Sequence, residues 1–94
     1  MFDITIQNNS EVYLSGSFNA ASIQKADQVL ADINSDCVIN FRDLEYISSA
    51  GLGSLIKTHV RLKNSGHTFR LINMNKHIRE VFRYSGLDKV MLID

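Results

Sequence analysis

Apolar and polar residues alternate at the start of the chain. Apolar side chains occupy every second position in 2–6 and again in 11–15. This period-two pattern is typical of half-buried strands. The Asn8-Asn9 pair between the two segments favours a turn, because Asn tolerates positive φ. The pattern therefore predicts a β-hairpin, and the segment Gly16–Asn19 then interrupts the alternation.

Three later segments carry apolar residues at helical spacing. The first follows Asn19, which can cap it, and the second runs from about Ala50 to Asn64 and stops at Ser65-Gly66. The third is capped by Asn73 or Asn75 and ends at Ser85-Gly86. The expected buried positions are Ile23, Ala26, Val29, Leu30 and Ile33, then Leu52, Leu55, Ile56 and Val60, then Ile78, Val81 and Phe82.

Short apolar runs at 37–41, 68–72 and 90–93 predict three further strands that alternate with these helices. Strands separated by helices are expected to be parallel, whereas the initial hairpin is antiparallel. The predicted order is ββαβαβαβ. We therefore expect an α/β sandwich with a mixed sheet of about five strands and three helices, formed by a single domain over residues 1–94.

Composition narrows the possible functions. Hydrophobic residues make up 45% of the 94 residues, which is typical of a globular chain. Ten basic residues balance ten acidic ones, so net charge does not favour nucleic acid or an anionic membrane as a partner. The sequence shows no bilayer-length apolar stretch and no signal peptide. We therefore expect a cytoplasmic protein that does not insert into membranes, and the single Cys37 agrees with a reducing compartment.

The segment Ser48–Gly53 is the main functional candidate. It follows an apolar run and opens the second helix, so Ser48 and Ser49 lie where a strand becomes a helix. One of these hydroxyls can cap the helix, or a serine there can be a presented site of modification. Gly51 and Gly53 each cost about 1 kcal/mol of helix propensity. A sequence that tolerates this cost requires close approach or special backbone angles at the turn.

Other chemistries find weaker support. The nucleophile-elbow pattern is only half present around Ser49, and neither Cys37 nor a histidine has a spacing that marks a catalytic base. The Gly51-Leu52-Gly53 sequence lacks the remaining features of a phosphate-binding loop. The Cys and His spacings predict no metal site. Scattered arginines give little support for RNA contact. The chain has histidines at positions 59, 67 and 77. The helical pattern predicts that His59 lies on the packed face of its helix or at the rim of that face.

The motif Asp43-Leu44…Ile47-Ser48-Ser49-Ala50-Gly51-Leu52-Gly53 resembles the signature of STAS domains of the anti-sigma factor antagonist family. The closing segment 78–90, with its Val81-Phe82 and Ser85-Gly86-Leu87, resembles the end of the same family, and Gly16 stands where the second strand ends in it. The resemblance covers essentially the whole chain and implies the same fold that the hydrophobic pattern predicts.

The resemblance implies a phosphorylation-switched binding protein and no enzyme. Such antagonists bind an anti-sigma factor that is also a serine kinase, and the serine aligned with Ser49 is phosphorylated; a PP2C-type phosphatase reverses the step. Ser48 is a second, lesser candidate acceptor. No cofactor is implied. The implied partner-binding residues are Gly16, Ser17, Phe18, Asn19, Ser48, Ser49, Ala50, Gly51, Leu52 and Gly53.

Two residues depart from the family pattern. Many members carry Asp immediately before the phosphorylated serine and Asp after the second strand, where this chain has Ser48 and Asn19. Asn keeps the capping capacity but not the charge. These departures leave an alternative open, in which the chain is an unswitched STAS adaptor or scaffold subunit of a transport or stress-signalling complex.

Overall fold

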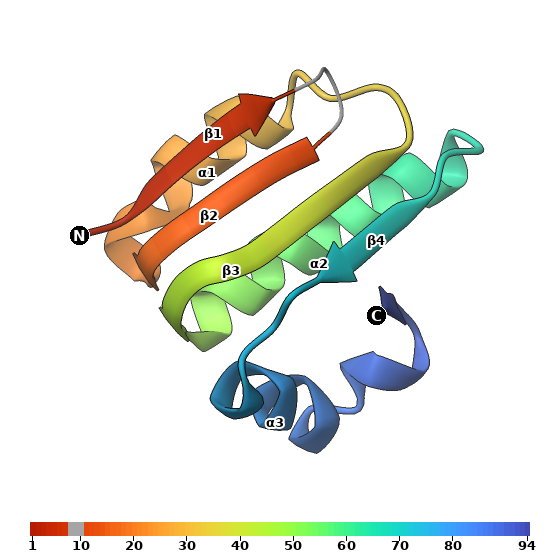
Figure 1. Cartoon of the computed structure of the whole chain (residues 1–94). Helices are drawn as coiled ribbons and strands as arrows, with labels where there is room; N and C mark the ends of the chain where they lie inside the picture. The colour runs from red at the N-terminus through yellow and green to blue at the C-terminus, as the bar shows by residue number, and fades with distance from the viewer. Residues whose placement is uncertain (8–10) are drawn as a thin grey trace.

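A computed structural model describes residues 1–7 and 11–94, and it contains one five-stranded mixed sheet with three α-helices (Figure 1). The elements are β1 (Asp3–Gln7), β2 (Glu11–Phe18), α1 (Ile23–Leu30), β3 (Cys37–Ile47), α2 (Ser49–Asn64), β4 (Phe69–Ile72), α3 (Lys76–Tyr84) and β5 (Leu92–Ile93). Single 3₁₀ turns precede α1 and follow α3. The predicted element order and fold class are confirmed, whereas the predicted turn at Asn8-Asn9 lies outside the described residues.

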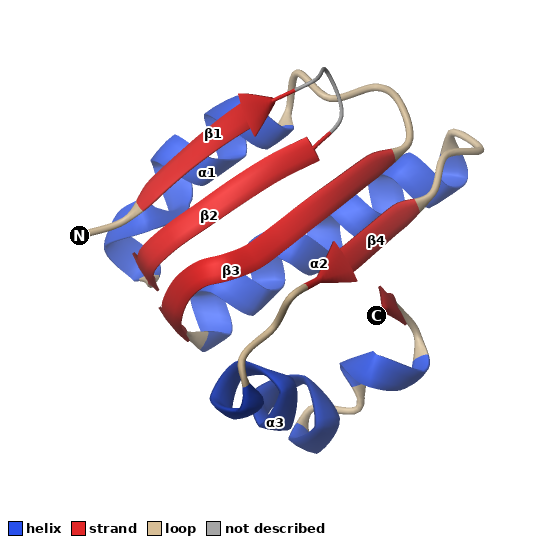
Figure 2. Ribbon diagram, in the orientation of Figure 1, coloured by secondary structure: helices blue, strands red, loops and turns tan. Residues whose placement is uncertain are grey.

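The strands follow one another in the sheet in chain order, β1-β2-β3-β4-β5. β1 pairs antiparallel with β2, and the remaining neighbours pair in parallel, as predicted. In Figure 2, α1 and α2 cover one face of the sheet, α3 lies beside its end, and no helix formed by the described residues covers the opposite face. This layering explains the alternation in the hairpin, because Ile4, Val12 and Leu14 are buried against the helices.

The strands β2 and β3 are longer than the sequence pattern predicts. β2 continues to Phe18, so the expectation that Gly16 ends this strand is wrong. Gly16 has a φ of +79°, and the β2–β3 register shifts on both sides of this region, which lets the pairing continue past the interruption. β3 likewise continues to Ile47, so part of the predicted turn motif is strand.

Several smaller predictions also need correction. Val60 is 48% exposed and does not belong to the core, whereas the polar Ser54 and Thr58 of α2 are buried. Ile33 is buried but lies beyond the end of α1. The last strand contains only Leu92–Ile93, because residues 87–89 form a 3₁₀ turn. Of the two predicted caps of α3, Asn75 accepts the hydrogen bond from the helix.

Candidate functional site

The ends of β2 and β3 bring the two predicted partner-binding segments together. Phe18 pairs with Ile47 at the end of the parallel ladder. One residue further on, the amide of Ser48 donates a hydrogen bond to the Phe18 carbonyl at 2.9 Å. The segment 16–19 therefore lies against the start of α2, although the two are far apart in the sequence. Strand pairing, rather than either turn, sets this arrangement.

The two adjacent serines have different environments. Ser48 is the N-cap of α2: its backbone is extended and its Oγ accepts a hydrogen bond from the Gly51 amide at 3.3 Å. Its carbonyl accepts from the Leu52 amide at 2.9 Å. Ser49 is the first residue of the helix, and its side chain is exposed. One serine thus serves the fold, while the next presents its hydroxyl to solvent at a helix N-terminus.

The two glycines of the turn also differ. A Cβ at position 51 would lie 2.8 Å from the Phe18 carbonyl oxygen and 2.9 Å from Ile47 Cγ1, which is closer than real Cβ atoms come to their neighbours. A Cβ at position 53 would meet nothing within 4 Å. Gly51 is therefore required by the packing of α2 on β2 and β3. Nothing within the described protein requires Gly53, so its absent side chain leaves open surface beside Ser49.

Asn19 organises the other segment of the site. Its Oδ1 accepts a hydrogen bond from the Ala21 amide at 3.0 Å, which caps the 3₁₀ turn before α1. The Ser22 hydroxyl donates to the Ser17 carbonyl at 3.1 Å and approaches Asn19 Oδ1 at 3.4 Å. A neutral amide performs this capping, so the loop needs no carboxylate here to keep its shape.

The structure sorts the ten predicted partner-binding residues by exposure. Ser49, Ala50 and Gly53 are exposed, and we call them the outer surface of the turn. Phe18 and Gly51 are buried, so they position this surface and do not face outward. The remaining residues are half-buried: Gly16, Ser17, Asn19, Ser48 and Leu52.

Sequence reasoning missed a hollow beside the Asn19 loop. Met1, Phe2 and Lys25 line it together with residues of the loop itself. The Phe2 ring stacks on Phe18, with centroids 4.7 Å apart, and so joins the chain start to this corner. These residues come from separate elements and share no motif, so no pattern along the sequence could have grouped them.

A polar network ties α1 to α2. Asp27 on α1 accepts a hydrogen bond from the Ser54 hydroxyl at 2.6 Å and pairs with Lys57 at 2.8 Å. Although partial burial opposes ionisation, the hydrogen bonds from Lys57 and Ser54 hold the pKa of Asp27 below its ordinary value. Arg61 donates to the carbonyls of Leu30 and Ile33, at 2.8 and 2.9 Å, and satisfies the end of α1. The helices behind the site are thus joined at two places, both in the C-terminal half of α1 or just beyond it.

Other candidate chemistry is not organised into a site. Cys37 is 1% exposed, and burial raises the pKa of its thiol to about 11, so it is protonated at neutral pH. Within residues 1–7 and 11–94, no three His, Cys, Asp or Glu side chains are grouped so that they could hold a metal ion. Over the same residues, no helix has both the length and the apolar character needed to cross a membrane.

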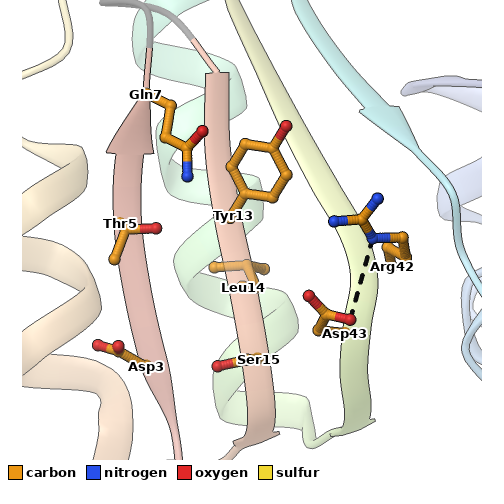
Figure 3. A pocket seen from close by; sticks show the side chains of 8 residues that line it. All are labelled: Asp3, Thr5, Gln7, Tyr13, Leu14, Ser15, Arg42 and Asp43. Atoms are coloured by element: carbon orange, nitrogen blue, oxygen red, sulfur yellow. Dashed lines mark ion pairs between the residues drawn. The ribbon is translucent and has the colours of Figure 1, made fainter.

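The open face of the sheet carries a polar hollow (Figure 3). Side chains from three strands line it, including Asp3, Tyr13 and Arg42. Its charged groups already have partners, because Arg42 Nε lies 4.0 Å from Asp43 Oδ1 and Asp3 pairs with Lys25 at 2.9 Å. These pairs account for the charged residues that line the hollow, so the outer surface of the turn remains the stronger candidate.

The structure has a mixed sheet backed by two helices, with one capping and one exposed serine where β3 gives way to α2, and this is the arrangement that the sequence motif predicts. Comparison with known families agrees: a family model described as "Mlab, STAS domain" matches residues 4–94. The chain therefore belongs to the STAS domain family.

Similar proteins carry the name of anti-sigma factor antagonists. The anti-sigma-B factor antagonist of Bacillus subtilis (strain 168) is 25% identical over 88 residues, which span 90% of this chain and 81% of that protein. The crystal structure of an anti-sigma factor antagonist from Mycobacterium paratuberculosis has a TM-score of 0.82 at 19% identity, over 99% of this chain and 83% of that one.

The anti-sigma factor antagonist SpoIIAA has been solved in two forms. Its unphosphorylated form has a TM-score of 0.73 at 15% identity, over all of this chain and 87% of that one. The phosphorylated form of the Bacillus protein has a TM-score of 0.72 at 19% identity, over all of this chain and 91% of that one. This chain thus has the fold of both forms.

Proposed function

We propose that this STAS domain is an anti-sigma factor antagonist that binds an anti-sigma factor with serine kinase activity and is released when Ser49 is phosphorylated. The observation that carries the proposal is the difference between the adjacent serines. Ser48 is engaged as the helix cap, whereas Ser49 is exposed beside Ala50 and Gly53. A PP2C-type phosphatase restores the binding form. The domain acts in the cytoplasm by binding alone, with no catalytic activity of its own.

The physical effect of the phosphate differs between the fold and the interface. Phosphorylation adds about −1.5 to −2 charge at neutral pH. At the first residue of α2 this charge lies near the helix N-terminus, where it is electrostatically favoured. Across a close interface the same charge is costly unless the partner supplies a cation. A single modification can therefore break a complex while the domain stays folded. Both forms of SpoIIAA share the fold of this chain, which supports the expectation that a phosphate leaves the domain folded.

Phosphorylation of the purified chain tests the acceptor directly. The protein is incubated with ATP and an anti-sigma factor serine kinase of the native host, and the phosphate is located by mass spectrometry. We expect one phosphate, on Ser49, that a PP2C-type phosphatase removes. The Ser49→Ala variant provides the control and should stay unmodified. Phosphate on Ser48 alone, or no phosphate on either serine, would contradict the proposed acceptor.

Binding to the partner tests the switch. In a pull-down from the native host, Ser49→Ala should retain the partner and Ser49→Asp should lose it. Because both variants change only an exposed side chain, a difference between them reports on the interface and not on folding. Equal recovery of the partner by both variants would sink the switching mechanism.

A second candidate function is an unswitched STAS adaptor, a scaffold subunit of a transport or stress-signalling complex. It is favoured by the uncharged surroundings of Ser49: the first turn of α2 contains no acidic residue, and Ser48 and Asn19 stand where the family commonly has Asp. This function predicts that Ser49→Asp binds the partner as well as the wild type does. A partner identified as a transport ATPase would decide for the adaptor.

A further inference from the structure

A second surface lies at the β4–β5 edge of the sheet, away from the Ser48–Gly53 turn. A hollow of about 270 Å³ opens there, with Phe69, Val90 and Leu92 on its apolar side and His59, Lys63 and His67 at its polar rim. We call this hollow the edge groove. The rise of an α-helix separates Lys63 from Ser49 by roughly 20 Å along α2. The edge groove is therefore distinct from the site of the proposed switch.

The apolar side of the edge groove is open to solvent. Val90 is 61% exposed and Leu92 is 51% exposed, although both are large aliphatic residues that line the same hollow. Single exposed apolar residues are common on protein surfaces. Two of them beside a concave apolar floor provide area that a partner side chain can cover.

One polar atom in the edge groove lacks a partner. His59 Nδ1 is buried and makes no hydrogen bond with any residue that the structure describes. The imidazole packs against Phe69, with ring centroids 5.9 Å apart. Burial, together with the nearby Lys63 charge, lowers the pKa of His59. The imidazole therefore contributes its ring face and edge to the wall of the groove, and its Nδ1 is covered by the protein.

Among the residues that the structure describes, the rim of the edge groove carries one unmatched cation. Lys63 is exposed and forms no ion pair with a residue in the described part of the chain. His67 lies 3.7 Å from Asp36, so its charge, when present, is already matched. The unmatched cation beside an apolar floor is complementary to a segment that combines apolar side chains with carboxylates.

The backbone beside the groove is equally open. β5 is the last strand of the sheet, so its outer edge pairs with no described strand. Free strand edges accept extended segments through main-chain hydrogen bonds. An extended occupant can reach the edge and the groove together, with alternate side chains directed toward the hollow, and because β5 contains only Leu92–Ile93 it gains few main-chain hydrogen bonds there and depends mainly on the groove.

We propose that the edge groove docks an extended acidic segment of a partner protein. The segment adds to β5 as a further strand, places an apolar side chain against Phe69 and Val90, and brings a carboxylate to Lys63. The proposal stands independently of the switch at Ser49.

The test is an NMR titration of the isotope-labelled full chain with a short synthetic peptide that repeats Val-Thr-Glu-Thr, so that valine and glutamate follow one another along a single face of the strand. We expect saturable shifts confined to residues 59–69 and 87–94. The same peptide with lysine in place of glutamate should not bind, and neither should a peptide in which all valines precede all glutamates. Shifts centred on the Ser48–Gly53 turn, or equal binding of all three peptides, would overturn the proposal.

Two charge variants sharpen the test. Lys63→Glu should weaken binding of the acidic peptide about two- to ten-fold, as expected for reversal of an exposed charge at the rim. Lys76→Glu, which makes the same change at an exposed position on α3, should leave the affinity unchanged. Equal affinity of Lys63→Glu and wild type would overturn the assignment of the carboxylate. Self-association through β5, or binding of anionic vesicles without binding of the peptide, would identify another occupant and overturn the proposal.

Discussion

Ser48 and Gly51 are held by contacts within the protein, whereas Ser49 and Gly53 are exposed, although each pair consists of the same two residue types. Ser48 accepts the Gly51 amide, and Gly51 fits against the Phe18 carbonyl. We call these two residues the inner half of the turn and Ser49 with Gly53 the outer half. The inner half needs its residue types for folding, and the outer half does not.

The two halves differ in whether packing within the protein offsets the unfavourable helix propensity of their glycine. Glycine in a helix costs about 1 kcal/mol relative to alanine. At position 51 the cost is matched by a close contact that no larger residue can make. At position 53 no contact within the described protein offsets it. Folding therefore does not explain why position 53 is glycine, and we attribute this glycine to the proposed binding of a partner.

Replacement of the inner glycine should have the largest effect. Gly51→Ala forces a Cβ against the Phe18 carbonyl oxygen and the Ile47 side chain. Overpacking of this kind costs about 1–3 kcal/mol, which exceeds the helix propensity that alanine gains. Urea denaturation should show the corresponding loss in the free energy of unfolding. A variant as stable as wild type would show that the two halves do not differ in packing.

Replacement of the inner serine should have the next largest effect. Ser48→Ala removes the side chain that accepts from the Gly51 amide. Loss of an N-cap costs about 1 kcal/mol, within a range of roughly 0.5–2. The same mutation at the neighbouring position, Ser49→Ala, should leave stability nearly unchanged, because that side chain is exposed. Equal losses for the two variants in thermal or urea unfolding would show that both hydroxyls serve the cap.

Replacement of the outer glycine should raise the free energy of unfolding, whereas the two replacements above lower it. Gly53→Ala adds a methyl group into open space and should stabilise the domain by about 0.4–1 kcal/mol. If the partner approaches this surface closely, the same variant should bind it less well than wild type does. Stability from urea denaturation and affinity from titration calorimetry would then change in opposite directions. Unchanged affinity would remove Gly53 from the interface.

The element order and most caps could be predicted because they depend on local patterns. Asn75 accepts a backbone hydrogen bond within one turn of itself, so its role is visible in the sequence. The prediction that Asn19 caps the first helix is wrong, because Asn19 caps the 3₁₀ turn before α1 and the N-cap of α1 is Ser22. The extension of β2 through Gly16 depends instead on pairing with β3, which no local pattern of β2 contains. The exposure of Val60 likewise depends on which part of α2 the sheet covers.

The site itself was predictable as a segment but not as two halves. The motif around Ser49 is continuous in the sequence, so its residues could be identified together. The different environments of Gly51 and Gly53 arise from Phe18, which reaches the turn through strand pairing. The edge groove likewise combines residues of α2 with residues near β5, which are far apart in the sequence. The apolar pattern of each element alone predicts only that the element has a buried face.

A negative charge on the outer half should have the smallest effect on the fold. Ser49→Asp places a carboxylate at the first residue of α2, whose first turn contains no acid. The helix dipole should make this change stabilising by about 0.3–1 kcal/mol at low ionic strength, and added salt should reduce the gain. Urea denaturation at two salt concentrations measures both effects, with Ser49→Asn as the neutral control of similar size. A clear loss of stability in Ser49→Asp alone would show that the turn cannot carry a charge. Release of a partner by phosphorylation would then require a change in the fold as well as in the interface.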